Sequence, residues 1–240
     1  MTSTDRKTFS ISVIIPTLNE EDNLDRLLKW LQGRPGIEII VVDGGSADQT
    51  VACARRHGVQ LIQTEPGRGG QLNRGAELAT REVLLFLHAD TLLPDNFADQ
   101  MHAVLALPQT AAGAFRLKID ARGTGYRCIE WGANLRSRFL QMPYGDQAIF
   151  VRNSVLRQAG GVPPQPIMED VALLRRLKRF GSIRIAPATV ITSARRWQSL
   201  GLIRTTLRNQ LMLLGAACGL QPHTLRRFYT GQNGKGRDRQ

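Results

Sequence analysis

Four continuous apolar runs, separated by amphipathic stretches, organise the first part of the chain. The runs are rich in β-branched residues and end at Gly, Pro or polar residues, which is typical of strands buried on both faces; they occupy residues 10–16, 37–42, 59–64 and 83–87. Helical spacing follows the first three runs, with Asn19 expected to cap one helix, Ser46 and Gln49 to form a capping box for the next, and a third helix at 69–80. This alternation predicts an α/β fold whose parallel sheet is covered by helices on both faces.

The pattern changes after residue 108. Short strands and two longer helices are expected there, the strands at 114–119, 148–151, 182–186 and 190–192 and the helices at 126–140 and 169–180. Beyond them, an apolar stripe at helical spacing runs beside Arg204 and Arg208 and consists of Leu200, Ile203, Leu207, Leu211 and Leu214. The stripe predicts a basic amphipathic helix, and the Gly-rich segment 231–240 is expected to be disordered.

Charge is distributed unevenly between the two halves. Residues 1–114 hold 10 Lys and Arg against 14 Asp and Glu, whereas residues 115–240 hold 22 against 6. A basic half of this kind favours contact with nucleic acid, an anionic membrane surface or phosphorylated ligands. The three cysteines form no CxxC pair, and the first ten residues lack the apolar stretch of a secretory signal, so we expect a reducing, cytoplasmic location.

Acidic residues stand where two of the apolar runs end. Ligands of parallel α/β sheets bind at the carboxyl ends of strands, so Asp43 in VVDGGSADQT is a candidate to contact a base or ribose. His88 and Asp90 in LHADT could hold Mg²⁺ or Mn²⁺ together with ligand phosphates. The alternative is structural, because Asp residues in loops commonly hold turns and His88 would then be an ordinary half-buried histidine.

Three further segments could carry chemistry. Glu169 and Asp170 open a helix, either as a general base or simply as acids that suit the helix dipole. The SARRW segment could bind a diphosphate through Arg195 and Arg196, or form a solvated basic turn. Arg68, in a glycine-rich turn that fits neither the GxGxxG nor the P-loop pattern, could contact phosphate.

The order of these segments is more specific than any one of them. The series PTLNEE, VVDGGSADQT, GRGGQLNRG, LHADT, GDQAIF, MEDVAL and SARRW resembles the inverting family 2 glycosyltransferases, and within them a group of small bacterial, non-processive enzymes. The resemblance covers about residues 10–200. It implies the GT-A fold, which is Rossmann-like with a mostly parallel central sheet flanked by helices, here followed by the basic helical extension.

The resemblance also implies roles for individual residues. The donor-binding set comprises Pro16, Asn19, Glu20, Asp43, Arg68, Asp90, Arg195, Arg196 and Trp197. Asp170 of the Glu169–Asp170 pair matches the catalytic base, Asp90 with His88 the Mn²⁺ or Mg²⁺ site, and Gly145, Asp146 and Gln147 the acceptor side. Two positions depart from the family pattern, because His88 replaces the first carboxylate of the DxD motif and Ser193 the Gln of QxxRW.

The domain division follows from these assignments. A catalytic domain is expected over 1–197, with a nucleotide-binding half at 10–107 and an acceptor half at 108–197, followed by a helical extension at 198–230 and the tail at 231–240. The expected activity is transfer of one sugar from a nucleotide-sugar to an acceptor hydroxyl, with inversion. There are two alternatives: a sugar-phosphate nucleotidyltransferase, and a non-enzymatic basic module that binds nucleic acid or membrane. If the protein is a transferase, we expect no nucleic-acid partner.

The acceptor is expected to be lipid-linked or apolar, because a basic amphipathic helix suits peripheral contact with the inner face of the cell membrane. The alternative is that this helix packs on the catalytic domain or forms a homodimer contact.

Overall fold

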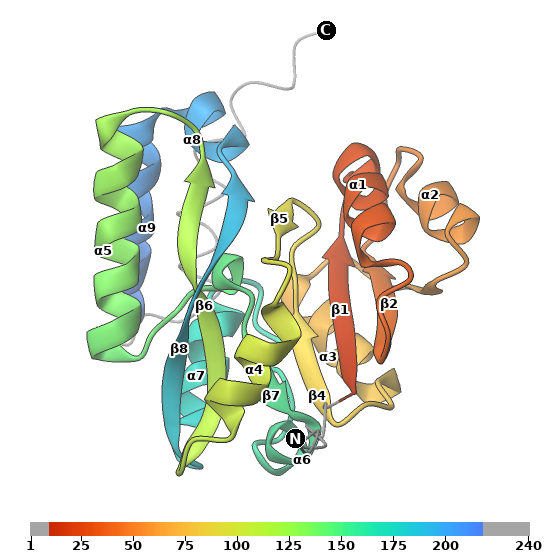
Figure 1. Ribbon diagram of the computed structural model, residues 1–240. Coiled ribbons are helices and arrows are strands. Elements are labelled where there is room, and N and C mark those ends of the chain that lie inside the picture. Colours follow the sequence, from red (N-terminus) through yellow and green to blue (C-terminus); the bar gives the residue numbers. More distant parts are fainter. Residues whose placement is uncertain (1–9, 218–240) are drawn as a thin grey trace, which may run out of the picture.

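One mixed sheet forms the centre of the protein (Figure 1). The computed structural model describes residues 10–217. Eight strands pair in the order β3-β2-β1-β4-β7-β6-β8-β5. Their bounds are β1 Ile11–Thr17, β2 Ile37–Asp43, β3 Gln60–Gln63, β4 Val83–Phe86, β5 Thr91–Leu92, β6 Thr110–Asp120, β7 Phe150–Arg152 and β8 Ser182–Ser193. The expected nucleotide-binding and acceptor halves therefore share a single sheet.

The first four strands are parallel, as the continuous apolar runs predict. β1 lies between β2 and β4, and β3 completes this part of the sheet. Every residue of β4 is buried, as is every residue of β1 except Pro16, because helices cover both faces. The register places Thr17 beside Asp43, so the polar residues that follow β1 and β2 emerge at the same edge.

Helices form a layer on each face. The core of one face contains buried side chains from α1 (Glu21–Leu31), α2 (Thr50–Arg56) and α4 (Phe97–Leu105). The other contains side chains from α3 (Arg68–Leu78), α6 (Asn153–Gln158) and α7 (Glu169–Leu177). The sequence did not predict α4, although it buries Phe97, Met101, Val104 and Leu105 at helical spacing, nor the short α6.

The second part of the sheet contains two antiparallel strands, which a mostly parallel sheet allows. β7 is antiparallel to β4 and β6, and β5 is antiparallel to β8, while β6 and β8 pair in parallel. The two short strands expected at 182–186 and 190–192 are one strand, β8. The β6–β8 register shifts between Ala114 and Arg116, opposite the segment that contains Pro187. A proline donates no ladder hydrogen bond, so this irregularity lets the strand continue through it.

Three helices lie beside the β6–β8 end of the sheet. α5 (Thr124–Leu140) runs next to α9 (Leu202–Ala217), which follows the short α8 (Arg195–Leu200) (Figure 1). Gly201, at φ +84°, separates α8 from α9, so the expected helix from Leu200 is interrupted there. Thr205 and Met212 face the protein.

Three residues of the predicted apolar stripe, Ile203, Leu207 and Leu211, are 72%, 59% and 64% exposed on α9. These three side chains are therefore not the ones that pack in the core of the catalytic domain. Within residues 10–217, no helix is both long enough and apolar enough to cross a membrane. Residues 218–230 of the extension and the tail at 231–240 lie outside the described residues.

Candidate active site

Asp43 organises the loop that follows β2. Its side chain is fully buried, and Oδ2 accepts hydrogen bonds from the backbone N–H groups of Gly45 (3.0 Å) and Ser46 (2.9 Å). Oδ1 accepts from the hydroxyls of Ser46 and Thr17. A carboxylate offers about four acceptor positions. The loop therefore uses the acceptor capacity of Asp43, which favours the structural alternative for this residue.

Asn19 joins the loop after β1 to the loop after β2. Its backbone is left-handed, at φ +55°, and its side-chain Oδ1 accepts the N–H of Ala47 at 2.8 Å. Its own N–H donates to Ser46 Oγ, also at 2.8 Å. The predictions that Asn19 caps α1 and that Ser46 and Gln49 box α2 are therefore wrong, because these polar groups pair between the two loops. Pro16 lies on β1, shortly before these loops, and is half-buried.

Glu20 and Asp90 meet across a guanidinium. Arg195 Nη2 lies 2.9 and 2.7 Å from the two carboxylate oxygens of Glu20 and 3.6 Å from Asp90 Oδ2. Desolvation raises the pKa of Asp90, the charge of Glu20 adds to the rise, and Arg195 opposes it. Folding thus brings three charged groups from distant parts of the chain to one carboxyl edge of the sheet.

His88, two residues before Asp90, lies near the arginines Arg68 and Arg196. Desolvation, reinforced by the charges of Arg68 and Arg196, holds the pKa of His88 well below its usual range. Its Nε2 has no hydrogen-bond partner among the described residues. A neutral imidazole with an unpaired nitrogen is competent to bind a cation or to donate a hydrogen bond.

A divalent cation fits this edge only with help from a ligand. Three side chains of the described residues 10–217 already lie close enough together to bind a metal: Asp25, Cys53 and His57. They belong to α1, to α2 and to the residue after α2, and none of them is Asp90 or His88. Asp90 supplies the hard oxygen that Mg²⁺ or Mn²⁺ prefers, and His88 supplies an unpaired nitrogen. The donor set therefore fits a cation whose remaining ligands are phosphate oxygens and water.

A cavity of about 330 Å³ lies next to this edge and brings together much of the expected site. It is lined by the sequence-predicted residues Arg68, His88, Gly145, Asp146, Glu169, Asp170, Arg196 and Trp197. Tyr144 and, from α9, Asn209 and Met212 also line it, although sequence reasoning missed them. Tyr144 could have been predicted, because it directly precedes the GDQAIF segment. No feature of the sequence near α9 connected that helix to the site.

Glu169 and Asp170 have different partners although they are adjacent. Glu169 is buried and pairs with Arg68, whose Nε lies 3.0 Å from Oε1. Burial raises the pKa of Glu169, and Arg68 opposes the rise. Asp170 instead accepts the N–H of Gly145 on Oδ2 (2.9 Å) and that of Val171 on Oδ1 (2.8 Å). Glu169 thus positions Arg68, and Asp170 is held by backbone groups at the cavity wall.

Arg68 is the first residue of α3 rather than part of a longer glycine-rich turn. Gly69 and Gly70 lie inside the first turn of this helix, so the expected glycine-rich turn reduces to Gly67. A Cβ on Gly69 would meet the carbonyl oxygen of Pro163 at 2.6 Å. The glycine is therefore needed for close packing of the loop that precedes α7.

The GDQ segment separates into a cavity residue and a structural one. Asp146 is half-buried at the cavity, its Oδ1 is inaccessible and unpaired, and desolvation raises its pKa to about 6. The charge of Arg136 opposes this rise, whereas the charges of Asp170 and Asp90 add to it. Gln147 does not line the cavity: it is fully buried and bonds Phe115 O (2.9 Å) and Ser137 Oγ (2.7 Å). Gln147 therefore supports the surrounding backbone, and its expected place on the acceptor side stays a prediction.

The consecutive arginines of SARRW point to different partners. Arg195 bridges Glu20 and Asp90, whereas Arg196 lines the cavity with Trp197. Desolvation lowers the pKa of Arg196, and its charge lowers the pKa of His88 across the cavity. The two arginines therefore place positive charge on adjacent parts of one edge.

Comparison with solved structures supports the fold. Glucosyl-3-phosphoglycerate synthase from Mycobacterium tuberculosis, solved in complex with Mn²⁺, uridine-diphosphate and glucosyl-3-phosphoglycerate, superposes with a TM-score of 0.64 at 20% sequence identity. The match covers 89% of this chain and 81% of that one. The architecture is the GT-A fold, as the sequence resemblance implied.

Sequence relatives point to the same group. An uncharacterized glycosyltransferase of Mycobacterium tuberculosis is 34% identical over 82 residues, which cover 34% of this chain and 37% of the relative. A PGL/p-HBAD biosynthesis glycosyltransferase of Mycobacterium bovis is 33% identical over 162 residues, which cover 62% of this chain and 61% of the relative. The chain thus spans about a third to three-fifths of these relatives. Residues 12–157 match the family model described as "Glycosyl transferase family 2", and the chain belongs to that family.

Proposed function

We propose that this protein transfers one sugar from a nucleotide-sugar to an acceptor hydroxyl, with inversion at the anomeric carbon. The observation that carries the proposal is the gathering of Asp170, His88 and Arg196 on one cavity, next to the edge where Arg195 links Glu20 and Asp90. A carboxylate, arginine side chains and a cavity that can hold a ligand thus lie together at the carboxyl ends of the strands.

The donor diphosphate is proposed to bind at Asp90 through Mn²⁺ or Mg²⁺, with His88 as a second ligand. A divalent cation held there would neutralise charge on the departing diphosphate. Support comes from the Mn²⁺ and uridine-diphosphate bound to the structurally similar synthase. Arg195 and Arg196 would bind the phosphate oxygens, for which the planar guanidinium is well suited. Arg195 would then lose one of its hydrogen bonds to Glu20 and form one to a phosphate oxygen instead.

Asp170 is proposed as the general base. Its carboxylate lines the cavity, and the N–H groups of Gly145 and Val171 hold it in one orientation. The acceptor hydroxyl would lose its proton to Asp170 as its oxygen attacks the anomeric carbon from the side opposite the diphosphate. A single displacement of this kind inverts the configuration. Glu169 contributes by holding Arg68 in the cavity wall rather than by taking the proton.

An apolar or lipid-linked acceptor and peripheral membrane contact complete the proposal. The exposed stripe Ile203, Leu207 and Leu211 supports them. Leu211→Ser should reduce flotation of the protein with anionic liposomes, whereas Leu107→Ser, which alters a 44% exposed leucine elsewhere, should not. Equal flotation of both variants would count against membrane contact through α9.

The donor is tested by a thermal-shift screen of nucleoside diphosphates with and without Mn²⁺, because a ligand of the folded state raises the melting temperature. Asp170→Asn should then bind the best nucleotide normally and lose about 10²–10⁴-fold in transfer rate, the usual contribution of a general base. Asp120→Asn, an exposed aspartate at the end of β6, is the matched control. Wild-type turnover by Asp170→Asn would remove the base assignment.

Family membership is the reason to prefer a transferase over the two alternatives. A sugar-phosphate nucleotidyltransferase would release pyrophosphate from a nucleoside triphosphate and a sugar phosphate. A basic nucleic-acid-binding module would bind oligonucleotides in a salt-sensitive manner and leave nucleotide-sugars untouched. Either result, without sugar transfer, would overturn the proposal.

A further inference from the structure

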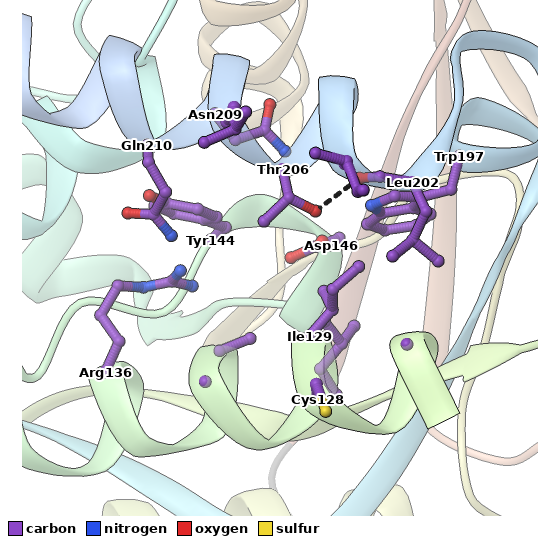
Figure 2. A pocket seen from close by; sticks show the side chains of 16 residues that line it. Cys128, Ile129, Arg136, Tyr144, Asp146, Trp197, Leu202, Thr206, Asn209 and Gln210 are labelled. Atoms are coloured by element: carbon purple, nitrogen blue, oxygen red, sulfur yellow. Dashed lines mark hydrogen bonds between the residues drawn. The ribbon is translucent and has the colours of Figure 1, made fainter. Parts of the chain in front are cut away.

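A second cavity, of about 420 Å³, opens between α5 and α9 (Figure 2). Its walls are largely apolar or small, and include Ile129, Gly132 and Ala133 of α5 and Leu202, Ile203 and Leu207 of α9. Figure 2 shows Ile129 and Leu202 from the two helices turned toward the same space. We call this cavity the α5–α9 groove. Of the residues assigned above to donor binding, Trp197 alone lines it.

Glycines shape the groove. At Gly125 the helices are in contact, because an added Cβ would lie 3.0 Å from Leu202 Cδ2. Further along α5, an added Cβ on Gly132 would meet nothing within 4 Å. The helices are thus close at one end and separated at the other. A glycine inside a helix costs about 0.5–1 kcal/mol relative to alanine, so Gly132 preserves open space at the expense of helix stability.

The groove is continuous with the catalytic cavity. The two share Tyr144, Asp146, Trp197 and Asn209 in their linings. At this junction the hydroxyl of Tyr144, Oδ1 of Asp146 and Nε1 of Trp197 are buried and have no hydrogen-bond partner among the described residues. Buried polar groups are normally paired, so these three unpaired atoms, with Asp146 between Tyr144 and Trp197 in Figure 2, indicate that polar groups of a ligand bind along the junction.

We propose that the α5–α9 groove binds the hydrocarbon portion of an amphiphilic alcohol, the sugar acceptor, and that the unpaired atoms of Tyr144, Asp146 and Trp197 bind its polar head. This rests on the proposed function and specifies its acceptor. The apolar part lies between Gly132 and Leu207, while the hydroxyl reaches past Asp146 to Asp170. An acceptor without an apolar part would leave the groove empty and its apolar walls in water.

Binding of straight-chain alcohols to the full-length protein tests the groove directly, by titration calorimetry with 1-decanol and 1-butanol. Each buried methylene contributes about fourfold to affinity, so 1-decanol should bind at least about tenfold more tightly than 1-butanol. Gly132→Leu fills the groove and should weaken 1-decanol binding about tenfold or more. Gly132→Ala, which makes the same change from glycine but leaves the groove open, should bind as the wild type does.

Two further measurements separate alcohol binding in the groove from a general loss of folding and from self-association. Leu207→Ser removes apolar surface without filling the groove and should also weaken 1-decanol binding. Nucleoside diphosphate binding with Mn²⁺ should be unchanged in all three variants. This binding reports on the donor site alone, so its absence from the wild type would refute the proposed function separately.

Equal 1-decanol affinity of Gly132→Leu and Gly132→Ala would overturn the groove proposal. A wild-type dimer that Gly132→Leu dissociates in sedimentation experiments would also overturn it, by assigning the groove to a second copy of the chain.

Discussion

The buried carboxyl of Asp146 should make the protein less stable than it would be with a neutral side chain. Desolvation raises its pKa from the ordinary value of 3.8 to about 6 in the folded protein. Between these two pH values the folded state holds the proton while the unfolded state releases it. Stability therefore falls as the pH rises from about 4 to about 6, and the loss is complete above the folded-state pKa.

Replacing Asp146 with asparagine removes this penalty while keeping the shape of the side chain. A pKa difference of about two units, at about 1.4 kcal/mol per unit, gives a stabilisation of about 3 kcal/mol at pH 7.5. Near pH 4.5, where the folded carboxyl is already protonated, the gain falls to about 1 kcal/mol. Asp146 is only half-buried, so water in the cavity makes both values upper limits.

Urea denaturation of wild-type protein and Asp146→Asn at pH 7.5 and 4.5 measures the effect. The exposed Asp120→Asn controls for the change in net charge. The raised pKa of Asp146 is refuted if Asp146→Asn is no more stable than wild type at pH 7.5, or if its advantage does not shrink on acidification. Confirmation would mean that the chain retains a destabilising acid in its cavity, which is typical of a functional group rather than a structural one.

Three other substitutions test the packing around the site, each by urea denaturation. Gly75→Ala should destabilise by about 1–3 kcal/mol, because the added methyl would overlap a β1 side chain, whereas Gly70→Ala has free space and should be neutral or stabilising; equal effects would contradict this. Asp43→Asn should cost about 1–3 kcal/mol because it exchanges an acceptor for a donor facing loop N–H groups; an unchanged midpoint would show that the loop is held otherwise. Arg68→Ala should cost about 3–5 kcal/mol by leaving Glu169 buried and unpaired, and adding Glu169→Gln should recover part of the loss; no recovery would mean that Arg68 acts through other contacts.

The sequence by itself was sufficient for the strands whose burial is continuous. β1 and β4 are buried on both faces, as is the second half of β2, so their apolar runs identified them and predicted parallel pairing. α4 escaped prediction although its apolar spacing is regular. The sequence also placed Asp43 at the end of β2 and Asp90 in the segment that follows β4, because strand ends follow directly from the limits of the apolar runs.

What only the tertiary structure decided was which polar groups meet. Adjacent side chains diverged: Arg195 joined Glu20 and Asp90 while Arg196 faced the cavity, and Glu169 paired with Arg68 while Asp170 bonded backbone N–H groups. Hydrophobic periodicity reports burial, which is a local property of each segment, whereas these pairings depend on distances between segments far apart in the chain. The same reason explains why the apolar stripe of α9 gave no sign that its helix, together with α5, forms a groove leading to the catalytic cavity.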